Sequence, residues 1–153
     1  LIREGKVINE VKEAIKHGVL FDIGHGSESF SLDTAAEGLK EGFEADMIST
    51  DIYERNMITP VGSLENTINK MIYLGWSVEK CIEKVTYEPA KAFKLKKLGE
   101  IKVGYMGDLT IFDIVENGRL ELKDSVNKVV TAKKYIKTKY VLIKDELIKK
   151  EDI

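Results

Sequence analysis

The apolar residues at the start of the chain change from helical spacing to a short continuous run. Residues 6–16 place apolar side chains on one helix face and charged ones opposite, which predicts a helix of about three turns that ends at Gly18. Residues 19–23 are mostly apolar, as is typical of a strand buried on both faces. This strand should run into a glycine-rich loop, Gly24-His25-Gly26-Ser27.

A second helix and strand follow that loop. Ser31 can cap a helix over residues 32–41, and residues 47–51 form another short, largely apolar run that ends in a carboxylate. A strand, a crossover helix and a second strand in this order are nearly always parallel neighbours in one sheet. We therefore expect the strands at 19–23 and 47–51 to pair in parallel.

Helical patterns dominate residues 63–95, and β patterns dominate the rest of the chain. Helix starts are predicted at Ser63, at Ser77 and near Pro89, which costs little in a first turn. After Gly99 the apolar period falls to about two. Asn117-Gly118 is a strong hairpin signal, so we expect it to join strands at 109–114 and 120–122. Further strands are predicted at 129–131 and 140–143.

Composition narrows the class of protein. The 153 residues suffice for about one domain but not for a complete eight-fold α/β barrel of roughly 250 residues. Apolar residues make up 43% and charged residues 33%, which predicts a folded soluble protein. The net charge of -2 gives no global attraction to nucleic acid or to an anionic membrane, although residues 119–150 hold 10 basic and 4 acidic side chains. These lysines alternate with apolar residues, so we expect them to solvate a β face or blunt an edge strand rather than to bind nucleic acid.

The absence of targeting signals and of cysteine pairs suggests a compartment. The sequence contains no run of about 18 apolar residues and no basic segment followed by an apolar stretch at its start. Cys81 is the single cysteine and cannot form an internal disulfide. We therefore expect no membrane contact and a cytoplasmic location.

Two polar residues stand where the predicted parallel strands end. His25 lies between two glycines after the first strand, and Asp51 closes the second. Ligands collect at the carboxyl ends of parallel strands, and neighbouring strands lie roughly 5 Å apart, so these side chains could share a pocket. Two plainer interpretations stay open: His25 as a histidine that caps a strand end, and Asp51 as the cap of a turn.

Recognisable catalytic motifs are otherwise missing from the sequence. It contains no His-x-His, Cys-x-x-Cys, His-Glu-x-x-His, P-loop or Gly-x-Ser-x-Gly pattern. One histidine and one aspartate do not complete a catalytic zinc site, which normally takes three protein ligands. The residues alone therefore make the chain a poor candidate for a complete metalloenzyme.

Four segments together resemble a known family. They are Phe-Asp-Ile-Gly-His-Gly-Ser-Glu-Ser-Phe at 21–30, Ile-Ser-Thr-Asp-Ile at 48–52, Thr-Tyr-Glu-Pro-Ala at 86–90 and Gly-Glu-Ile-Lys-Val-Gly-Tyr-Met-Gly-Asp-Leu-Thr-Ile-Phe-Asp at 99–113. In this order they resemble the C-terminal part of amidohydrolase-superfamily enzymes, most closely the amidohydrolase/deacetylase branch that is often labelled dihydroorotase.

The resemblance implies a fold class and a division of the chain. The class is α/β: a partial TIM barrel, made of the last two βα units plus helices, followed by a small, mainly antiparallel β subdomain. Residues 1–98 would be the C-terminal part of the (β/α)8 barrel, with 19–24 as its seventh strand and 46–51 as its eighth. Residues 99–153 would be the C-terminal share of a composite β-sandwich domain.

The resemblance also implies a site and a reaction. The full-length enzyme would use a divalent metal, Zn²⁺, to hydrolyse a C–N bond in a small linear or cyclic non-peptide amide. Asp51 would bind the metal, take the proton from the attacking water and give it to the leaving nitrogen. The substrate would be contacted by the loop of Gly24, His25, Gly26 and Ser27. Dihydroorotate, acetylated hydroxy or amino acids and other cyclic amides all suit this aspartate.

The family's other metal ligands would lie upstream of Leu1, which leads to expectations about the isolated chain. We expect it to be a piece of a longer hydrolase that by itself binds no tight zinc and hydrolyses nothing. Strands cut from a closed barrel expose pairing edges, so we expect a homo-oligomer. The alternative is a stand-alone, non-catalytic scaffold module that pairs with another subunit and contributes Asp51 to a shared site.

Overall fold

The computed structural model describes residues 1–152, and its first elements differ from the predicted ones. An antiparallel hairpin of β1 (Ile2–Arg3) and β2 (Lys6–Val7) precedes α1 (Asn9–Lys16). The predicted start of the first helix at residue 6 is therefore wrong. Glu4 and Gly5 adopt left-handed backbone conformations, with φ of 52° and 73°, which turn the chain back so that Lys6 and Val7 pair as a strand.

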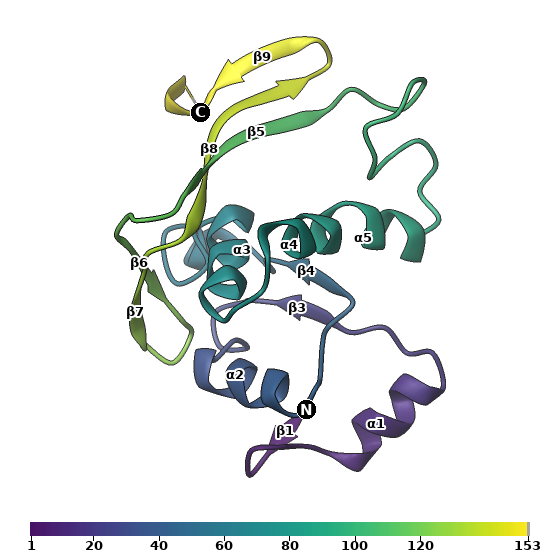
Figure 1. Cartoon of the computed structure of the whole chain (residues 1–153), viewed down its shortest axis with the longest axis vertical. Coiled ribbons are helices and arrows are strands. Elements are labelled where there is room, and N and C mark those ends of the chain that lie inside the picture. Colours follow the sequence, from purple (N-terminus) through teal and green to yellow (C-terminus); the bar gives the residue numbers. More distant parts are fainter. Residues whose placement is uncertain (153) are drawn as a thin grey trace.

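The predicted βαβ unit is confirmed. It consists of β3 (Asp22–Gly24), α2 (Leu32–Lys40) and β4 (Met47–Ser49), and the two strands pair in parallel with Ile23 opposite Ile48 (Figure 1). Ser31 caps α2 by accepting a hydrogen bond from the backbone N–H of Thr34. Both strands are shorter than predicted: Val19 and Leu20 are about half exposed and lie before β3.

The helical segment also follows the sequence prediction. After a short 3-10 turn at Glu54–Asn56 come α3 (Leu64–Tyr73), α4 (Val78–Val85) and α5 (Tyr87–Ala92). The hydroxyls of Ser63 and Ser77 cap α3 and α4. The α3 and α4 helices pack against β4, and the core they build contains Phe30, Leu32, Ile48, Ile68, Met71, Ile72, Trp76, Val78, Cys81 and Ile136.

The C-terminal strands are antiparallel, but their pairing differs from the predicted one. They are β5 (Leu109–Val115), β6 (Leu120–Lys123), β7 (Val129–Ala132), β8 (Tyr135–Ile143) and β9 (Glu146–Lys149), followed by a 3-10 turn at Lys150–Asp152. One sheet has the order β5-β8-β9 and the other pairs β6 with β7. The expected hairpin of β5 with β6 is therefore wrong.

Close packing explains why Asn117-Gly118 does not close a hairpin. The Gly118 N–H donates to the Lys133 carbonyl oxygen, so this segment pairs with the chain that leads into β8. A Cβ at Gly118 would lie 2.5 Å from the Tyr135 ring, which means that the glycine permits a close approach of the two segments. The hairpin turn instead lies between β6 and β7, at residues 124–128.

The β strands are attached to α3 through buried polar contacts. The Asn69 side chain accepts from the Ile136 N–H at 2.8 Å and donates to the Ile136 carbonyl at 3.0 Å. The Glu65 carboxylate accepts from the Thr138 N–H at 2.6 Å. Because β8 is the central strand of its sheet, these bonds fasten the sheet to the helical part of the chain.

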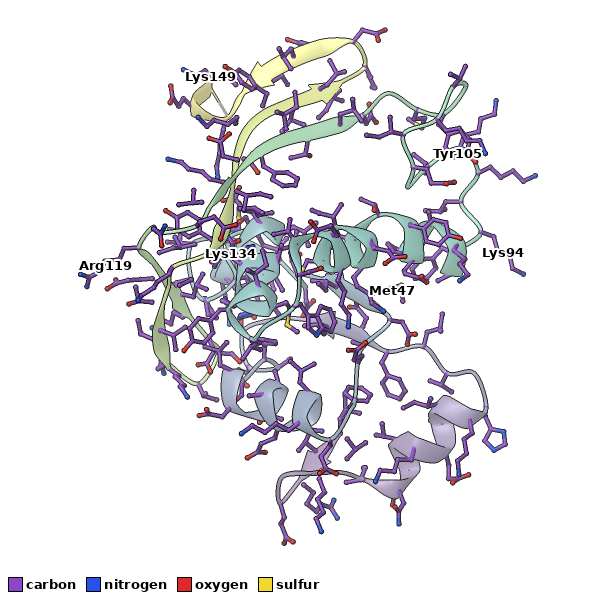
Figure 2. All side chains as sticks on the ribbon, viewed as in Figure 1. Met47, Lys94, Tyr105, Arg119, Lys134 and Lys149 are labelled. Carbon is purple, nitrogen blue, oxygen red and sulfur yellow. The ribbon has the colours of Figure 1, made fainter. Side chains whose placement is uncertain are left out.

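Several lysines of the C-terminal, mainly β part of the chain are paired with acids. Lys134 lies 3.0 Å from Glu116, and Lys139 lies 3.0 Å from Asp113. Figure 2 shows Arg119 extending away from the neighbouring ribbon.

In the part of the chain that the structure describes, no helix is long and apolar enough to span a bilayer.

Candidate active site at the ends of β3 and β4

Asp51 stands two residues after β4 in a turn that its neighbours hold in shape. Its side chain is exposed, and its backbone is left-handed, with φ of 48°. The fully buried Asn56 donates from Nδ2 to the Asp51 carbonyl at 3.0 Å and accepts from the Tyr53 N–H at 2.7 Å. A buried amide that bonds both ends of the turn stabilises the unusual backbone conformation of Asp51.

The Asp51 carboxylate lies against the loop that follows β3. Its Oδ2 is 2.9 Å from the position that a Cβ at Gly26 would occupy. Gly26 is itself left-handed, with φ of 55°, and its N–H donates to the Thr50 carbonyl at 3.0 Å. Glycine therefore serves here both for its backbone conformation and for the space it leaves. The ends of the two parallel strands meet at one place, with the carboxylate facing the loop.

His25 points into the protein. Its ring is fully buried and stacks on Phe30 with centroids 4.9 Å apart. Nδ1 lies 2.9 Å from the Gly26 carbonyl oxygen and Nε2 lies 2.6 Å from Nζ of Lys70. A carbonyl only accepts, so Nδ1 carries the proton and Nε2 accepts from Lys70. Burial lowers the pKa of His25 despite the hydrogen bond to Gly26, and the nearby lysine lowers it further.

Lys70 is the buried partner that the sequence analysis did not find. It lies on α3 and donates to the imidazole and, at 2.7 Å, to the Pro60 carbonyl oxygen. Burial lowers its pKa to about 8, against an opposing effect of Asp124. Lysine is seldom fully buried, and its neighbours in the sequence contain no signal for such a position. The ammonium group thus joins the loop after β3 to the loop after β4.

A second bridge between the two loops lies nearer the surface. The Ser27 hydroxyl and the Tyr53 hydroxyl are 2.6 Å apart, and either can be the donor. Gly24 ends β3, where a Cβ would lie 3.9 Å from the Cβ of Asp51. Of the four loop residues named from the sequence, the two glycines lie beside Asp51. Ser27 bonds Tyr53, and His25 faces the interior.

The side-chain donors at the strand ends supply only part of a metal site. Among residues 1–152, no three His, Cys, Asp or Glu side chains come together as a metal-binding group. Both ring nitrogens of His25 are engaged, and the exposed carboxylate that lies against the loop after β3 is that of Asp51. The described residues fit a metal only as the source of one carboxylate ligand.

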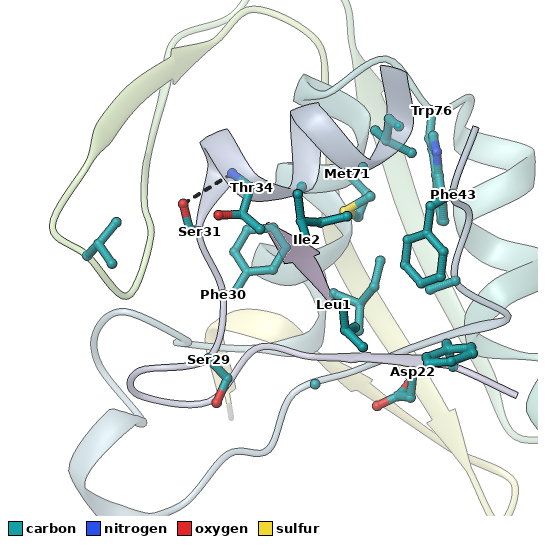
Figure 3. Close-up of a pocket in the computed structure, with 18 of the residues that line it drawn as sticks. Leu1, Ile2, Asp22, Ser29, Phe30, Ser31, Thr34, Phe43, Met71 and Trp76 are labelled. Atoms are coloured by element: carbon teal, nitrogen blue, oxygen red, sulfur yellow. Dashed lines mark hydrogen bonds between the residues drawn. The ribbon is translucent and has the colours of Figure 1, made fainter. Parts of the chain in front are cut away.

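A separate cavity lies beside this site. It has a volume of about 330 Å³ and is lined chiefly by apolar residues of β3, α2 and the first two positions of the chain (Figure 3). Trp76 also lines it, and its Nε1 is buried without a hydrogen-bond partner in the described structure. Asp51 is not among the lining residues, so the cavity and the carboxylate are distinct features.

The chain is similar in sequence to known proteins. Residues 2–148 match the model of a family described as the amidohydrolase family. A deacetylase of Enterococcus faecalis is 42% identical over 126 residues, which cover 82% of this chain and 34% of the deacetylase.

Two solved structures have a similar arrangement. The crystal structure of an adenine deaminase superposes with a TM-score of 0.88 at 38% identity, covering 94% of this chain and 39% of the deaminase. That of a dihydroorotase superposes with a TM-score of 0.82 at 33% identity, covering 92% and 38%. The chain thus spans little more than a third of the length of these proteins.

Proposed function

This chain belongs to the amidohydrolase family, and on that premise we propose that it is the C-terminal portion of a metal-dependent hydrolase of non-peptide amide C–N bonds. Two of the matched proteins, the adenine deaminase and the dihydroorotase, are named for hydrolysis at a carbon–nitrogen bond, and the third is named for the removal of an acetyl group. The observation that supports the proposal within this chain is the position of the Asp51 carboxylate against Gly26, at the carboxyl ends of two parallel strands.

Asp51 has two tasks in this proposal. It is one ligand of a divalent metal, with Zn²⁺ as the first choice, and it exchanges protons with the reacting groups. When bound, such a metal supplies a water whose pKa falls towards about 7. The Asp51 carboxylate accepts the proton as the water oxygen attacks the amide carbon, and it returns that proton to the nitrogen as the C–N bond breaks.

The loop after β3 serves as the substrate contact. Gly24, Gly26 and Ser27 lie next to the carboxylate or bridge to the facing loop, where a small amide could meet backbone N–H groups and hydroxyls. His25 contributes to this loop from the inside, since its imidazole bonds Lys70 and the Gly26 carbonyl. Acetylated amino acids and cyclic amides such as dihydroorotate are the substrates to test first.

We propose residues 1–98 as the last two βα units of a barrel and residues 99–153 as the β subdomain. In the described structure β3 and β4 pair only with each other, and apolar side chains such as Ile58 and Val103 are 91% and 102% exposed. Unpaired strand edges and exposed apolar groups favour association. Gel filtration of the isolated chain should show an oligomer, and a clean monomer at low micromolar concentration would contradict this.

The test of function requires a longer protein that includes the segments present in the relatives but not in this chain. Its metal content and its turnover of acetylated amino acids and cyclic amides should be measured beside those of Asp51→Asn. The amide keeps the size of the side chain but cannot accept the proton, so we expect kcat to fall by roughly 10²-fold to 10⁴-fold.

Asp33→Asn is the matched control, because Asp33 is an exposed aspartate of α2 that pairs with Lys128 on the surface. It should keep the turnover of the parent. Full turnover in the Asp51→Asn variant would refute the assigned role, and an absence of metal-dependent turnover in the longer protein would favour the scaffold alternative.

A further inference from the structure

The tip of the β6–β7 hairpin lies against the end of the loop that carries His25. Ser125 accepts a hydrogen bond from the Phe30 N–H at 2.9 Å through its hydroxyl, and the same hydroxyl donates to the Phe30 carbonyl oxygen. The Ser125 N–H also donates to that carbonyl, at 3.0 Å. These contacts join positions 95 residues apart in the sequence.

Asp124 fastens the same hairpin to the first turn of α2. Its Oδ2 accepts from the Leu32 N–H at 2.9 Å, while Oδ1 accepts from the N–H groups of Val126 at 3.0 Å and Lys128 at 2.8 Å. The residue is only 1% exposed. One buried carboxylate therefore closes the hairpin turn and satisfies an amide at the helix start, where no intrahelical partner exists.

The contacts continue from the hairpin to the candidate active site. Phe30, which the hairpin holds through both of its backbone groups, stacks on the His25 ring. His25 bonds the Gly26 carbonyl, and Gly26 lies against the Asp51 carboxylate. The inner side of the loop is held by Lys70 and its far end by the hairpin.

We propose that Asp124 and Ser125 are positioning residues for the site, and that the hairpin tip holds the loop after β3 in register with Asp51. The loop's contact with substrate rests on the proposed function, whereas the restraint of the loop by the hairpin does not. Neither residue touches the reacting atoms in this proposal. They limit the motion of the loop. Because the loop is rich in glycine and serine, fixing its backbone costs conformational entropy, so contacts from outside the loop are needed to hold it.

Amide hydrogen exchange of the full chain tests the restraint directly. The matched pair is Ser125→Val, which removes the hydroxyl, and Ser125→Thr, which keeps the hydroxyl on a side chain of nearly the same volume as valine. Because two hydrogen bonds are lost, we expect exchange in residues 24–31 of the Val variant to rise on the order of tenfold, while exchange in α3 keeps its value. The Thr variant should stay within about twofold of the parent. Lys128→Ala, which removes only the exposed pair with Asp33, should behave like the parent.

Unchanged exchange in residues 24–31 of the Val variant would overturn the proposal, and so would an equal rise in that loop and in α3, which reports general destabilisation. The longer protein adds a second measurement. In the longer protein, Ser125→Val should lower kcat/KM and Ser125→Thr should keep it at the parent value. Ile136→Val, a buried core change that destabilises the chain about as much as Ser125→Val, should not lower kcat/KM. If exchange responds as expected but Asp51→Asn keeps full turnover, the proposed function fails and the restraint stands.

Discussion

Lys70 offers a test of how burial and hydrogen bonding compete inside this protein. Its ammonium group is fully buried and donates to the His25 imidazole and to the Pro60 carbonyl oxygen. The substitution Lys70→Met keeps a long, flexible side chain but removes the charge and both donors. The variant thus relieves the burial of a charge and, at the same time, leaves two buried acceptors without partners.

The two effects are similar in size at neutral pH. In the folded chain the pKa of Lys70 is about 8, against 10.5 for an ordinary lysine. At 1.36 kcal/mol per pKa unit, burial of the charge costs about 3 kcal/mol at pH 7. Each orphaned acceptor costs about 1–3 kcal/mol, so Lys70→Met should change the free energy of unfolding at pH 7 only slightly.

The pH dependence separates the effects. Between about pH 8 and 10.5 the unfolded chain keeps a proton on Lys70 that the folded chain has released, so the stability of the parent rises with pH in that window. From pH 7 to pH 9 the free energy of unfolding of the parent should rise by about 1 kcal/mol relative to that of Lys70→Met. We end the comparison at pH 9, because above that pH the unfolded chain releases the Cys81 proton, whereas burial raises the pKa of Cys81 to about 12 in the folded chain. The free energy of unfolding of the parent and of the variant therefore falls as the pH rises further.

Urea unfolding followed by the fluorescence of Trp76, the single tryptophan, measures these free energies. Lys40→Met is the control, because Lys40 is an exposed lysine of α2, and its variant should stay parallel to the parent from pH 7 to pH 9. A constant difference between the parent and Lys70→Met over this range would refute the assigned environment of Lys70.

Three further predictions use the same unfolding assay or a thiol reagent. Gly26→Ala should destabilise the chain by about 1–2 kcal/mol, since alanine is strained at φ of 55°; an unchanged urea midpoint would contradict this. Gly118→Ala should cost about 1–3 kcal/mol by overlap with the Tyr135 ring, whereas Gly107→Ala, with no atom within 4 Å, should cost less than about 0.5 kcal/mol; equal effects would disprove the close approach. Cys81 should react with a thiol reagent only in urea, because burial raises the pKa of its thiol to about 12; rapid reaction of the folded chain would exclude that environment.

The local features of the fold were predictable where one short-range interaction decides them. Helices start where predicted after Ser31, Ser63 and Ser77, and all three serines cap them, because a hydroxyl bonds an amide three residues away and needs no distant partner. The parallel pairing of β3 with β4 was equally accessible, since the handedness and length of a βαβ connection leave few other arrangements.

Pairing in the β strands could not be predicted in this way. Asn117-Gly118 has the preferred composition of a tight hairpin turn, yet packing against Tyr135 and the bond to Lys133 direct the chain elsewhere. Likewise, the positive φ of Glu4 and Gly5 turned a predicted helical start into a hairpin. At Gly118, contacts with another segment outweighed the local preference for a hairpin turn, whereas at Glu4 and Gly5 a tight turn replaced the start of the helix.

From the first helix onward, the sequence by itself determined the order of the helices and strands and the two polar residues at the strand ends, because caps, apolar periods and the βαβ rule act over short distances. Only the tertiary structure decided that the Asp51 carboxylate lies against Gly26 while the His25 ring turns inward to Lys70. It also decided that Asp124 and Ser125 hold the far end of the same loop. Burial of a lysine or an aspartate requires partners from distant segments, and only the folded chain brings those partners together.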